Sequence, residues 1–189
     1  AEAARDLIYN ALPKLTVSDI KRLIVKGAKE VLSCGITTVH TDDFEAIAAG
    51  EYQKVLDAYH QLEQEGNLPV RIYEQCLLAS VPLLKKFLNE GHHTNEGSPM
   101  FRIGTLKLLV DGSLAFLRKP YKNDPSTKGI ATFTQEELDK LVSMAQASGL
   151  MISPHNIGDG AMEMDLNAIE NAQIQYPRAD MRHALIHCQ

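Results

Sequence analysis

The sequence lacks the features that mark membrane proteins and nucleic-acid-binding proteins. No apolar run approaches the roughly 18 residues that are needed to span a bilayer. Acidic residues outnumber basic ones by 24 to 19, and the resulting net charge of -5 argues against binding to a phosphate backbone. We therefore expect no membrane and no nucleic acid among the partners of this chain, and a small molecule as its ligand.

Cysteine is scarce, and its three copies are Cys34, Cys76 and Cys188. An odd number at wide spacing in apolar surroundings argues against a disulfide framework. The pattern predicts reduced, buried thiols in a cytoplasmic protein.

The chain also lacks a glycine-rich phosphate loop, internal repeats and low-complexity tracts. A length of 189 residues is enough for one sizeable core, so we predict a single domain over 1–189. The segment AEAARDLIYN predicts a helix directly at the start, and HALIHCQ reads as a strand at the end. We expect the chain to be a piece of a larger protein.

Strand-like and helix-like segments alternate along the sequence. Residues 16–35 combine an amphipathic stripe with a capping-box pair, Thr16 and Asp19. A second capping-box pair, Thr134 and Glu137, opens another helix. The five predicted strands are 36–40, 69–78, 101–112, 150–155 and 184–187. Strands joined through helices pair in parallel, which predicts an α/β fold that is either a (β/α)8 barrel or a doubly wound sheet. No GxGxxG follows the first strand, so nothing supports the dinucleotide-binding version.

Lys107 lies in the middle of the apolar run GTLKLLVDG. Alternation along a strand places Thr105, Lys107 and Leu109 on one face and an aliphatic set on the other. Burying an ammonium group is costly unless it is paired or neutralised. A carbamate formed with carbon dioxide would neutralise it, whereas a lysine that reaches the rim, or pairs with Asp111, is the plainer alternative.

His155 and His187 each close a short apolar run, LMISPH and HALIH. The carboxyl ends of parallel strands meet at one rim, and neutral imidazole is a good ligand for Zn2+. A single histidine at a strand end is more often a hydrogen-bonded core residue. Two on successive strands, with Lys107 one strand earlier, favour a metal site.

The other polar candidates have simpler interpretations. Asp42, Asp43 and Asp159 stand at expected helix starts and are predicted to be caps. His40 ends a strand, but the residues that follow it also fit a cap. His183 lies at the wrong end of its strand for the metal site, and solvated positions are predicted for His60, His92 and His93.

The segments GITTVHTDDF, LKLLVDGSLAF, HNIGDGAMEMDLNAIE and RHALIHCQ resemble the amidohydrolase superfamily. More narrowly, they are similar to the amidohydrolase 3 (YtcJ-like) group of metal-dependent hydrolases. In that group K-x-x-x-D-G-S ends strand four of the barrel, H-x-I-G-D-x-A follows strand five, and a histidine with x-Q ends strand six. The resemblance implies a partial TIM (β/α)8 barrel in which this chain supplies strands two to six with outer helices.

The resemblance also implies a site. Lys107 matches the lysine that is commonly carboxylated to bridge two metals, and His155 and His187 match ligands of the second metal. The cofactor would be a divalent metal, expected to be Zn2+, with one or two ions in the full-length site. The family's H-x-H pair on strand one and its general-base aspartate on strand eight would lie outside this chain.

These implications lead to one leading hypothesis and two alternatives. The leading one is a hydrolase of amide or other non-peptide C–N bonds that uses a metal-activated water, with the isolated fragment inactive. Lys107 could instead form a Schiff base in an aldolase-like barrel. A third possibility is a non-catalytic binding module with structural histidines. Unpaired edges of the partial sheet predict association between copies of the fragment.

Overall fold

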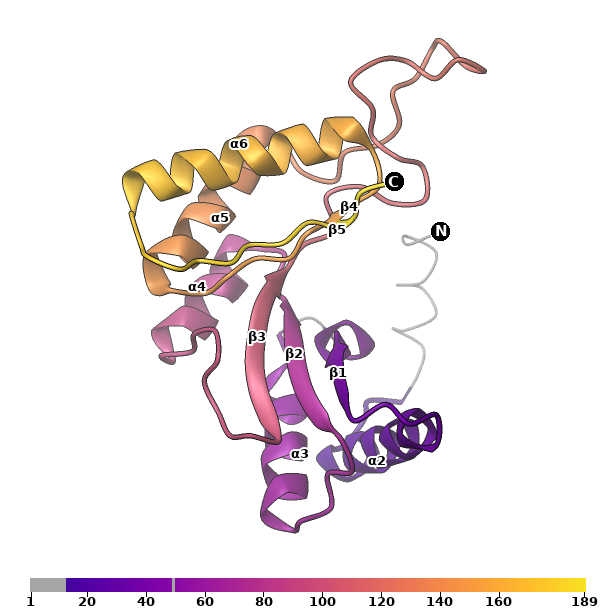
Figure 1. The fold of residues 1–189 in the computed structure, drawn as a ribbon, viewed down its shortest axis with the longest axis vertical. Coiled ribbons are helices and arrows are strands. Elements are labelled where there is room, and N and C mark those ends of the chain that lie inside the picture. The colour runs from indigo at the N-terminus through magenta and orange to yellow at the C-terminus, as the bar shows by residue number, and fades with distance from the viewer. Residues whose placement is uncertain (1–12, 49) are drawn as a thin grey trace. The chain divides into compact units, whose positions relative to one another are not determined.

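The structure, a computed structural model, describes residues 13–48 and 50–189. Helices and strands alternate along the chain (Figure 1). The chain divides into two compact units, Ala1–Glu74 with Gly97–Arg102, and Gln75–Glu96 with Ile103–Gln189. Single-domain organisation stays a prediction, and the helix predicted in AEAARDLIYN lies outside the described residues.

The first unit contains helix α2 (Val17–Ser33), strand β1 (Thr38–Thr41), the short 3-10 helix η1 (Asp43–Ala46), helix α3 (Gln53–Gln64) and the start of strand β2 (Arg71–Leu77). The predicted capping box begins α2. Thr16 Oγ1 accepts from the Asp19 backbone N–H, and the Asp19 carboxylate accepts from the Thr16 N–H. This reciprocal pair satisfies two of the amide groups that a helix start leaves without partners.

The sequence from TDDF to Gly66 predicts one continuous helix, whereas the structure has two elements there, η1 and α3, which corrects this boundary. Gly50 has a φ of +88°, a left-handed conformation that a continuous helix cannot contain. Helical spacing of the apolar residues predicts the inner face of this helix. The prediction is confirmed for α3, because all five residues are buried: Tyr52, Val55, Leu56, Tyr59 and Leu62.

A buried carboxylate from β2 holds the start of η1. Glu74 Oε1 accepts from the backbone N–H groups of Asp43 at 2.9 Å and Phe44 at 3.3 Å. Asp42 makes no side-chain capping bond, and Asp43 accepts from the Thr41 and Tyr59 hydroxyls, so the predicted aspartate caps are wrong. Burial, reinforced by the neighbouring aspartates, raises the pKa of Glu74 well above its ordinary value.

The second unit contains the other elements: helix α4 (Val81–Asn89), most of strand β3 (Phe101–Lys107), helix α5 (Gln135–Ser148), strand β4 (His155–Asn156), helix α6 (Asp159–Gln175) and strand β5 (Ile186–His187). The second capping box is confirmed, because Thr134 Oγ1 accepts from the Glu137 N–H and the Glu137 carboxylate accepts from the Thr134 N–H. Gly149, at a φ of +77°, ends α5 in the left-handed conformation typical of helix ends.

The strands follow sequence order. One sheet has the order β1-β2-β3 and the other β4-β5, and both β1 with β2 and β4 with β5 pair in parallel. Two isolated parallel bridges, Leu106 with Ile152 and Leu109 with His155, connect β3 to the β4 segment. The predicted α/β class with parallel strands is therefore confirmed.

Strands β4 and β5 are shorter than the predicted 150–155 and 184–187. The chain is extended before both of them, because the Ala184 N–H donates to Ile152 O and the Ile186 N–H donates to Pro154 O. Pro154 has no N–H to contribute to the ladder. The regular pairing is therefore confined to two residues on each strand.

The structure also bears on two features of the sequence, its lack of long apolar runs and its three cysteines. No helix in the described ranges is long and apolar enough to cross a membrane. Cys76 is buried and reduced as predicted, but Cys34 and Cys188 are exposed, so burial of all three thiols is wrong.

Candidate metal centre at the strand ends

Strand β3 presents one apolar face and one polar face. Leu106, Leu108 and Val110 are completely buried, as the alternation predicted. On the other face the Thr105 hydroxyl bonds to Ser153 Oγ, and Gln75 Nε2 donates to the same oxygen at 3.0 Å.

Lys107 is the last residue of β3 and lies on this polar face by alternation. Only 6% of its surface is exposed. The lysine is thus buried, and the alternative in which it reaches into solvent is wrong.

His155 and His187 lie side by side. The centroids of their rings are 4.4 Å apart, and the ring planes meet at 69°. His155 opens β4 and His187 ends β5, where it pairs in parallel register with Asn156. Because each strand has only two residues, the two histidines singled out from the sequence lie one register position apart on neighbouring parallel strands, and their rings meet.

The backbone of His187 has an unusual conformation. Its φ is +80° and that of Cys188 is +54°, in the left-handed region that non-glycine residues rarely adopt. Alternation alone would send His187 to the face opposite that of Ile186, the register partner of His155. The left-handed turn ends this alternation where the ring contacts His155. Such strain costs on the order of 1–3 kcal/mol and is concentrated at functional sites.

Asp111 joins the loops that follow β3 and β4. Its buried carboxylate accepts three backbone N–H groups, from Phe116 at 3.0 Å, Ile157 at 2.9 Å and Gly158 at 2.7 Å. Its Oδ1 also lies 3.8 Å from His155 Nε2. A carboxylate held in this way is well placed to orient an imidazole ligand.

The turn before α6 packs tightly against the same loop. A Cβ atom on Gly158 would lie 1.9 Å from Phe116 O, so no larger residue fits there. Phe116 O accepts from the Gly160 N–H at 3.0 Å and the Ala161 N–H at 3.3 Å, which satisfies amide groups at the start of α6. The loop after Lys107 is thereby fixed to the loop after His155.

Helix α6 contains a second buried carboxylate, that of Asp165. Asp165 on α6 is fully buried, and burial raises its pKa from the ordinary 3.8 to about 7. The nearby Asn156 side chain offsets part of the effect, and the charge of Asp111 adds to it.

His183 has a structural role, consistent with its exclusion from the predicted site. Its Nδ1 accepts from the Ile152 N–H at 3.1 Å, and its Nε2 lies 2.9 Å from Gln146 Oε1. This arrangement fixes a neutral imidazole with the proton on Nε2. Burial lowers the pKa of His183, in agreement with that tautomer.

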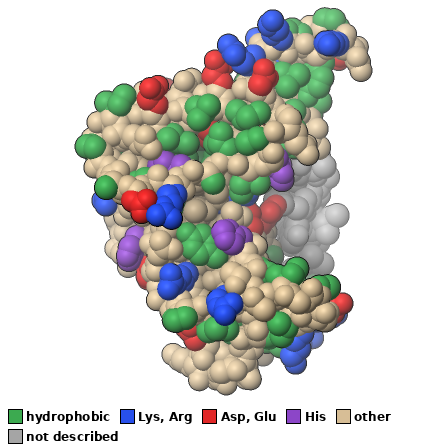
Figure 2. Space-filling view, viewed as in Figure 1, with side chains coloured by type: hydrophobic (Ala, Val, Ile, Leu, Met, Phe, Trp, Pro, Cys, Tyr) green, Lys and Arg blue, Asp and Glu red, His purple; other side chains and the backbone are tan. Residues whose placement is uncertain are grey.

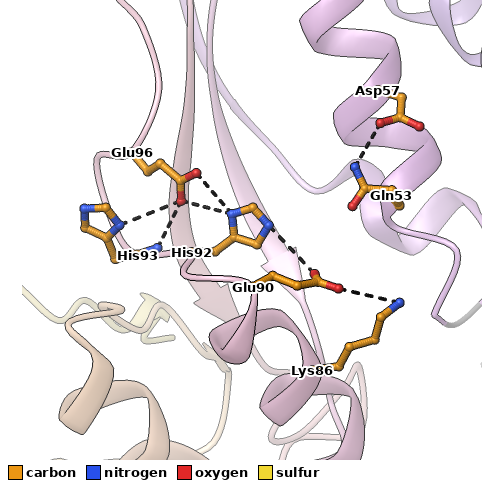
Figure 3. A network of polar contacts seen from close by, with 7 residues as sticks. All are labelled: Gln53, Asp57, Lys86, Glu90, His92, His93 and Glu96. Atoms are coloured by element: carbon orange, nitrogen blue, oxygen red, sulfur yellow. Dashed lines mark hydrogen bonds and ion pairs between the residues drawn. The ribbon is translucent and has the colours of Figure 1, made fainter.

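The loop after α4 holds a separate polar network (Figure 3). His92 Nδ1 lies 3.0 Å from Glu96 Oε2, and its ring stacks on Phe87 with centroids 4.4 Å apart. The predicted solvated position is therefore wrong for His92, whose side chain is mostly covered by these neighbours. It is confirmed for His60 and His93, which are exposed.

His40 and Asp159, which the sequence suggests as helix caps, make other contacts in the structure. His40 ends up against the Tyr73 ring, with centroids 4.7 Å apart. Asp159 accepts from the Arg118 N–H at 3.0 Å rather than from its own helix, so its predicted cap is also wrong.

His155 and His187 are residues of the type that binds metal ions, but two ligands are too few for a complete site. Two imidazoles in contact suit a divalent ion, whose nitrogen ligands lie about 2.0–2.1 Å from it. Across the ranges that the structure describes, no group of three or more His, Cys, Asp and Glu side chains is arranged to hold a metal ion. Further donors are therefore required, and Lys107 becomes one only if it is modified.

Sequence reasoning missed the part that Asp111 plays. The sequence suggests Asp111 only as a partner for Lys107, whereas in the structure its oxygens accept from three backbone N–H groups of two loops. The available signal was an aspartate followed by glycine directly after a buried strand. Asp165 gave no signal, because an acidic residue in a helix is usually solvated.

Comparison with known proteins decides the family. The model of the amidohydrolase family matches residues 1–189. This chain belongs to the amidohydrolase family. The resemblance stated from the sequence is thereby confirmed.

Two known proteins are similar to this chain over its whole length. The YtcJ protein of Bacillus subtilis (strain 168), whose name assigns it to the amidohydrolases, is 31% identical over 193 residues. The Arabidopsis thaliana protein LONG AFTER FAR-RED 3 is 24% identical over 205 residues. The matched regions are 34% and 33% of these relatives, so the chain spans about a third of their length.

Two solved structures share the fold. An uncharacterized metal-dependent hydrolase from Pyrococcus furiosus is 33% identical, with a TM-score of 0.73 over 91% of this chain and 35% of its own. The corresponding hydrolase from Pyrococcus horikoshii OT3 is 32% identical, with a TM-score of 0.69 over 82% of this chain and 31% of its own.

Proposed function

We propose that the complete protein containing this chain is a metal-dependent hydrolase of amide or other non-peptide C–N bonds, acting on a small molecule. The observation that carries the proposal is the contact between His155 and His187 at the ends of neighbouring parallel strands. Family membership and the metal-dependent hydrolases among the structural neighbours support it.

The roles of this chain's residues follow from their chemistry. His155 and His187 would hold a divalent ion, expected to be Zn2+, through neutral imidazole nitrogens. Lys107 would join them as a carbamate, whose two oxygens can bridge a pair of ions. A bound divalent ion lowers the pKa of water and polarises a carbonyl group, which is the chemistry needed to hydrolyse an amide.

Asp111 would act as a positioning residue. It holds the loops after β3 and β4 together, and it lies beside the Nε2 atom of His155. A carbamate on Lys107 would replace its positive charge by a negative one, which bound cations would offset. Further ligands and a general base would come from other parts of the complete protein, within a partial (β/α)8 barrel built from strands two to six. We expect the isolated chain to be inactive.

Metal analysis of the complete protein tests the proposal. We expect about one or two divalent ions per chain, hydrolysis of at least one member of an amide panel, and loss of that activity with a chelator. His155→Ala and His187→Ala should each reduce the metal content, and the exposed His93→Ala is the matched control. Full metal content in both variants would contradict the proposed ligands.

A Schiff-base enzyme is the second candidate, because Lys107 is buried at the end of β3 and a lysine amine can form a Schiff base with a carbonyl substrate. Borohydride would then trap a substrate on Lys107, and activity would survive the chelator. A third possibility, a binding module with structural histidines, predicts neither trapping nor bound metal.

A further inference from the structure

A basic segment follows β3 in a chain that is acidic overall. Residues 113–131, here called the basic arm, contain Arg118, Lys119, Lys122 and Lys128 but only one acidic residue, Asp124. Lys and Arg side chains gather at one extremity of the surface, where Figure 1 shows the chain after β3 as a projecting loop (Figure 2). This charge is opposite in sign to the net charge of -5.

The basic arm is ordered by its own hydrogen bonds. The Leu117 N–H donates to Lys128 O at 2.7 Å, and the Tyr121 N–H donates to Thr127 O at 3.0 Å. The Tyr121 hydroxyl donates to Ala115 O at 2.6 Å. These bonds fold the arm back on itself, so that its basic side chains project from a defined backbone.

The base of the arm is attached to the candidate metal centre. Asp111 binds the Phe116 N–H, and the Arg118 N–H donates to Asp159, four residues after His155. Residues 117–123 of the arm, together with Asp159 and Gln189, line a cleft of about 880 Å³. Gln189 stands two residues after His187 and Asp159 four residues after His155, so the cleft is lined by residues that closely follow both histidines in the chain.

The charge of the cleft is mostly positive and partly uncompensated. Arg118 Nε lies 3.2 Å from Glu163, and Asp159 adds one negative charge. Within the described part of the chain, Lys119 and Lys122 form no ion pair. Two lysines in a cleft of ligand size provide an attractive site for an anion.

We infer that the basic arm recognises an anionic group of the substrate, so that the preferred substrates are amides bearing a carboxylate or a phosphate. This inference rests on the proposed hydrolase function. Lys119 and Lys122 would bind the anion, while the amide extends toward His155 and His187. The ordered arm limits the entropy lost when the lysines engage the ligand.

Binding of small anions to the complete protein tests the inference without requiring hydrolysis. Glutarate, inorganic phosphate and the neutral diamide glutaramide would be titrated by calorimetry against the wild type, the K119Q/K122Q double variant and K128Q. Lys128 is the matched control, because it stands on the same arm but does not line the cleft. All three lysines are exposed, and thermal melting would establish that the variants remain folded.

We expect the wild type to bind glutarate or phosphate more tightly than glutaramide. An exposed ion pair changes a binding constant by about two- to fivefold, so removing two of them in the double variant should weaken binding of the anion by about four- to twenty-fivefold. K128Q should bind it nearly as the wild type does, and 0.5 M salt should reduce the difference. Tighter binding of phosphate than of glutarate would identify a phosphate, and the reverse a carboxylate.

Equal affinities for glutarate, phosphate and glutaramide, or an equal loss in K128Q and the double variant, would overturn the inference. Kinetics separate this failure from that of the hydrolase proposal. If the lysines bind anions but no amide is hydrolysed, the hydrolase proposal fails alone. If amides are hydrolysed and the double variant has an unchanged KM for glutaramate, the role of the basic arm fails alone.

Discussion

Asp111 Oδ1 lies 3.8 Å from His155 Nε2, across two loops that the same carboxylate holds together. Replacing Asp111 by Asn would put an amide group where an oxygen now accepts from backbone N–H groups. We expect Asp111→Asn to lose about 1–3 kcal/mol of stability and to weaken metal binding about 10–100-fold in the complete protein. Urea unfolding and metal titration would measure the two effects. Asp180→Asn, on an exposed side chain, should change neither.

Replacing Lys107 tests the proposal that its carbamate bridges two metal ions. We expect Lys107→Ala in the complete protein to lose metal-dependent activity, because the carbamate oxygens go with the side chain. Short carboxylic acids added to this variant should restore part of the activity by supplying similar oxygens. Lys140→Ala, at an exposed position on α5, should remain active. Undiminished activity in the Lys107 variant would rule out the bridge.

Gly158 offers a test of the packing between the loops. The Cβ of Gly158→Ala would lie 1.9 Å from Phe116 O, so backbone atoms must move. We expect a loss of about 1–3 kcal/mol, as for other overpacked sites. In Gly27→Ala the added Cβ has no neighbour within 4 Å, and we expect a gain of about 0.5–1 kcal/mol in the middle of helix α2. Comparable stability of the two variants in urea would contradict this account.

Asp165 should make stability depend on pH. Its pKa is raised to about 7, so the folded state keeps a proton that the unfolded chain releases near the ordinary 3.8. The free energy of unfolding therefore falls as the pH rises from about 4 to about 7, by at most about 4 kcal/mol from this group. Asp165→Asn should flatten that part of the profile and be more stable than the wild type at pH 8. An unchanged slope in urea titrations at several pH values would exclude the effect.

Strands β1 and β5 each pair with one neighbour in their sheets. Unpaired ladder groups on a strand edge are templates for pairing with another chain. We therefore expect the isolated 189-residue chain to dimerise or aggregate, and light scattering that finds a clean monomer at high concentration would contradict this. The complete protein, in which we expect further strands to pair with both edges, is the comparison.

The sequence predicted those elements whose signals are local. Both capping boxes, the buried face of α3 and the order of the strands follow from residues close together in the chain. Features that depend on distant partners were not predictable. Glu74 caps η1 from another strand, and the left-handed backbone of His187 becomes visible only beside His155.

The attachment of the basic arm has a consequence for how specificity can change. The backbone N–H groups of Phe116 and Arg118 tie its base to Asp111 and Asp159, which follow β3 and β4, whereas bonds within the arm hold its tip. We therefore expect that residues 119–127 can be exchanged without disturbing the proposed metal ligands His155 and His187. Chimeras that swap only this tip between family members would then transfer substrate preference while leaving the chemistry intact, which makes the arm a natural unit for diversification.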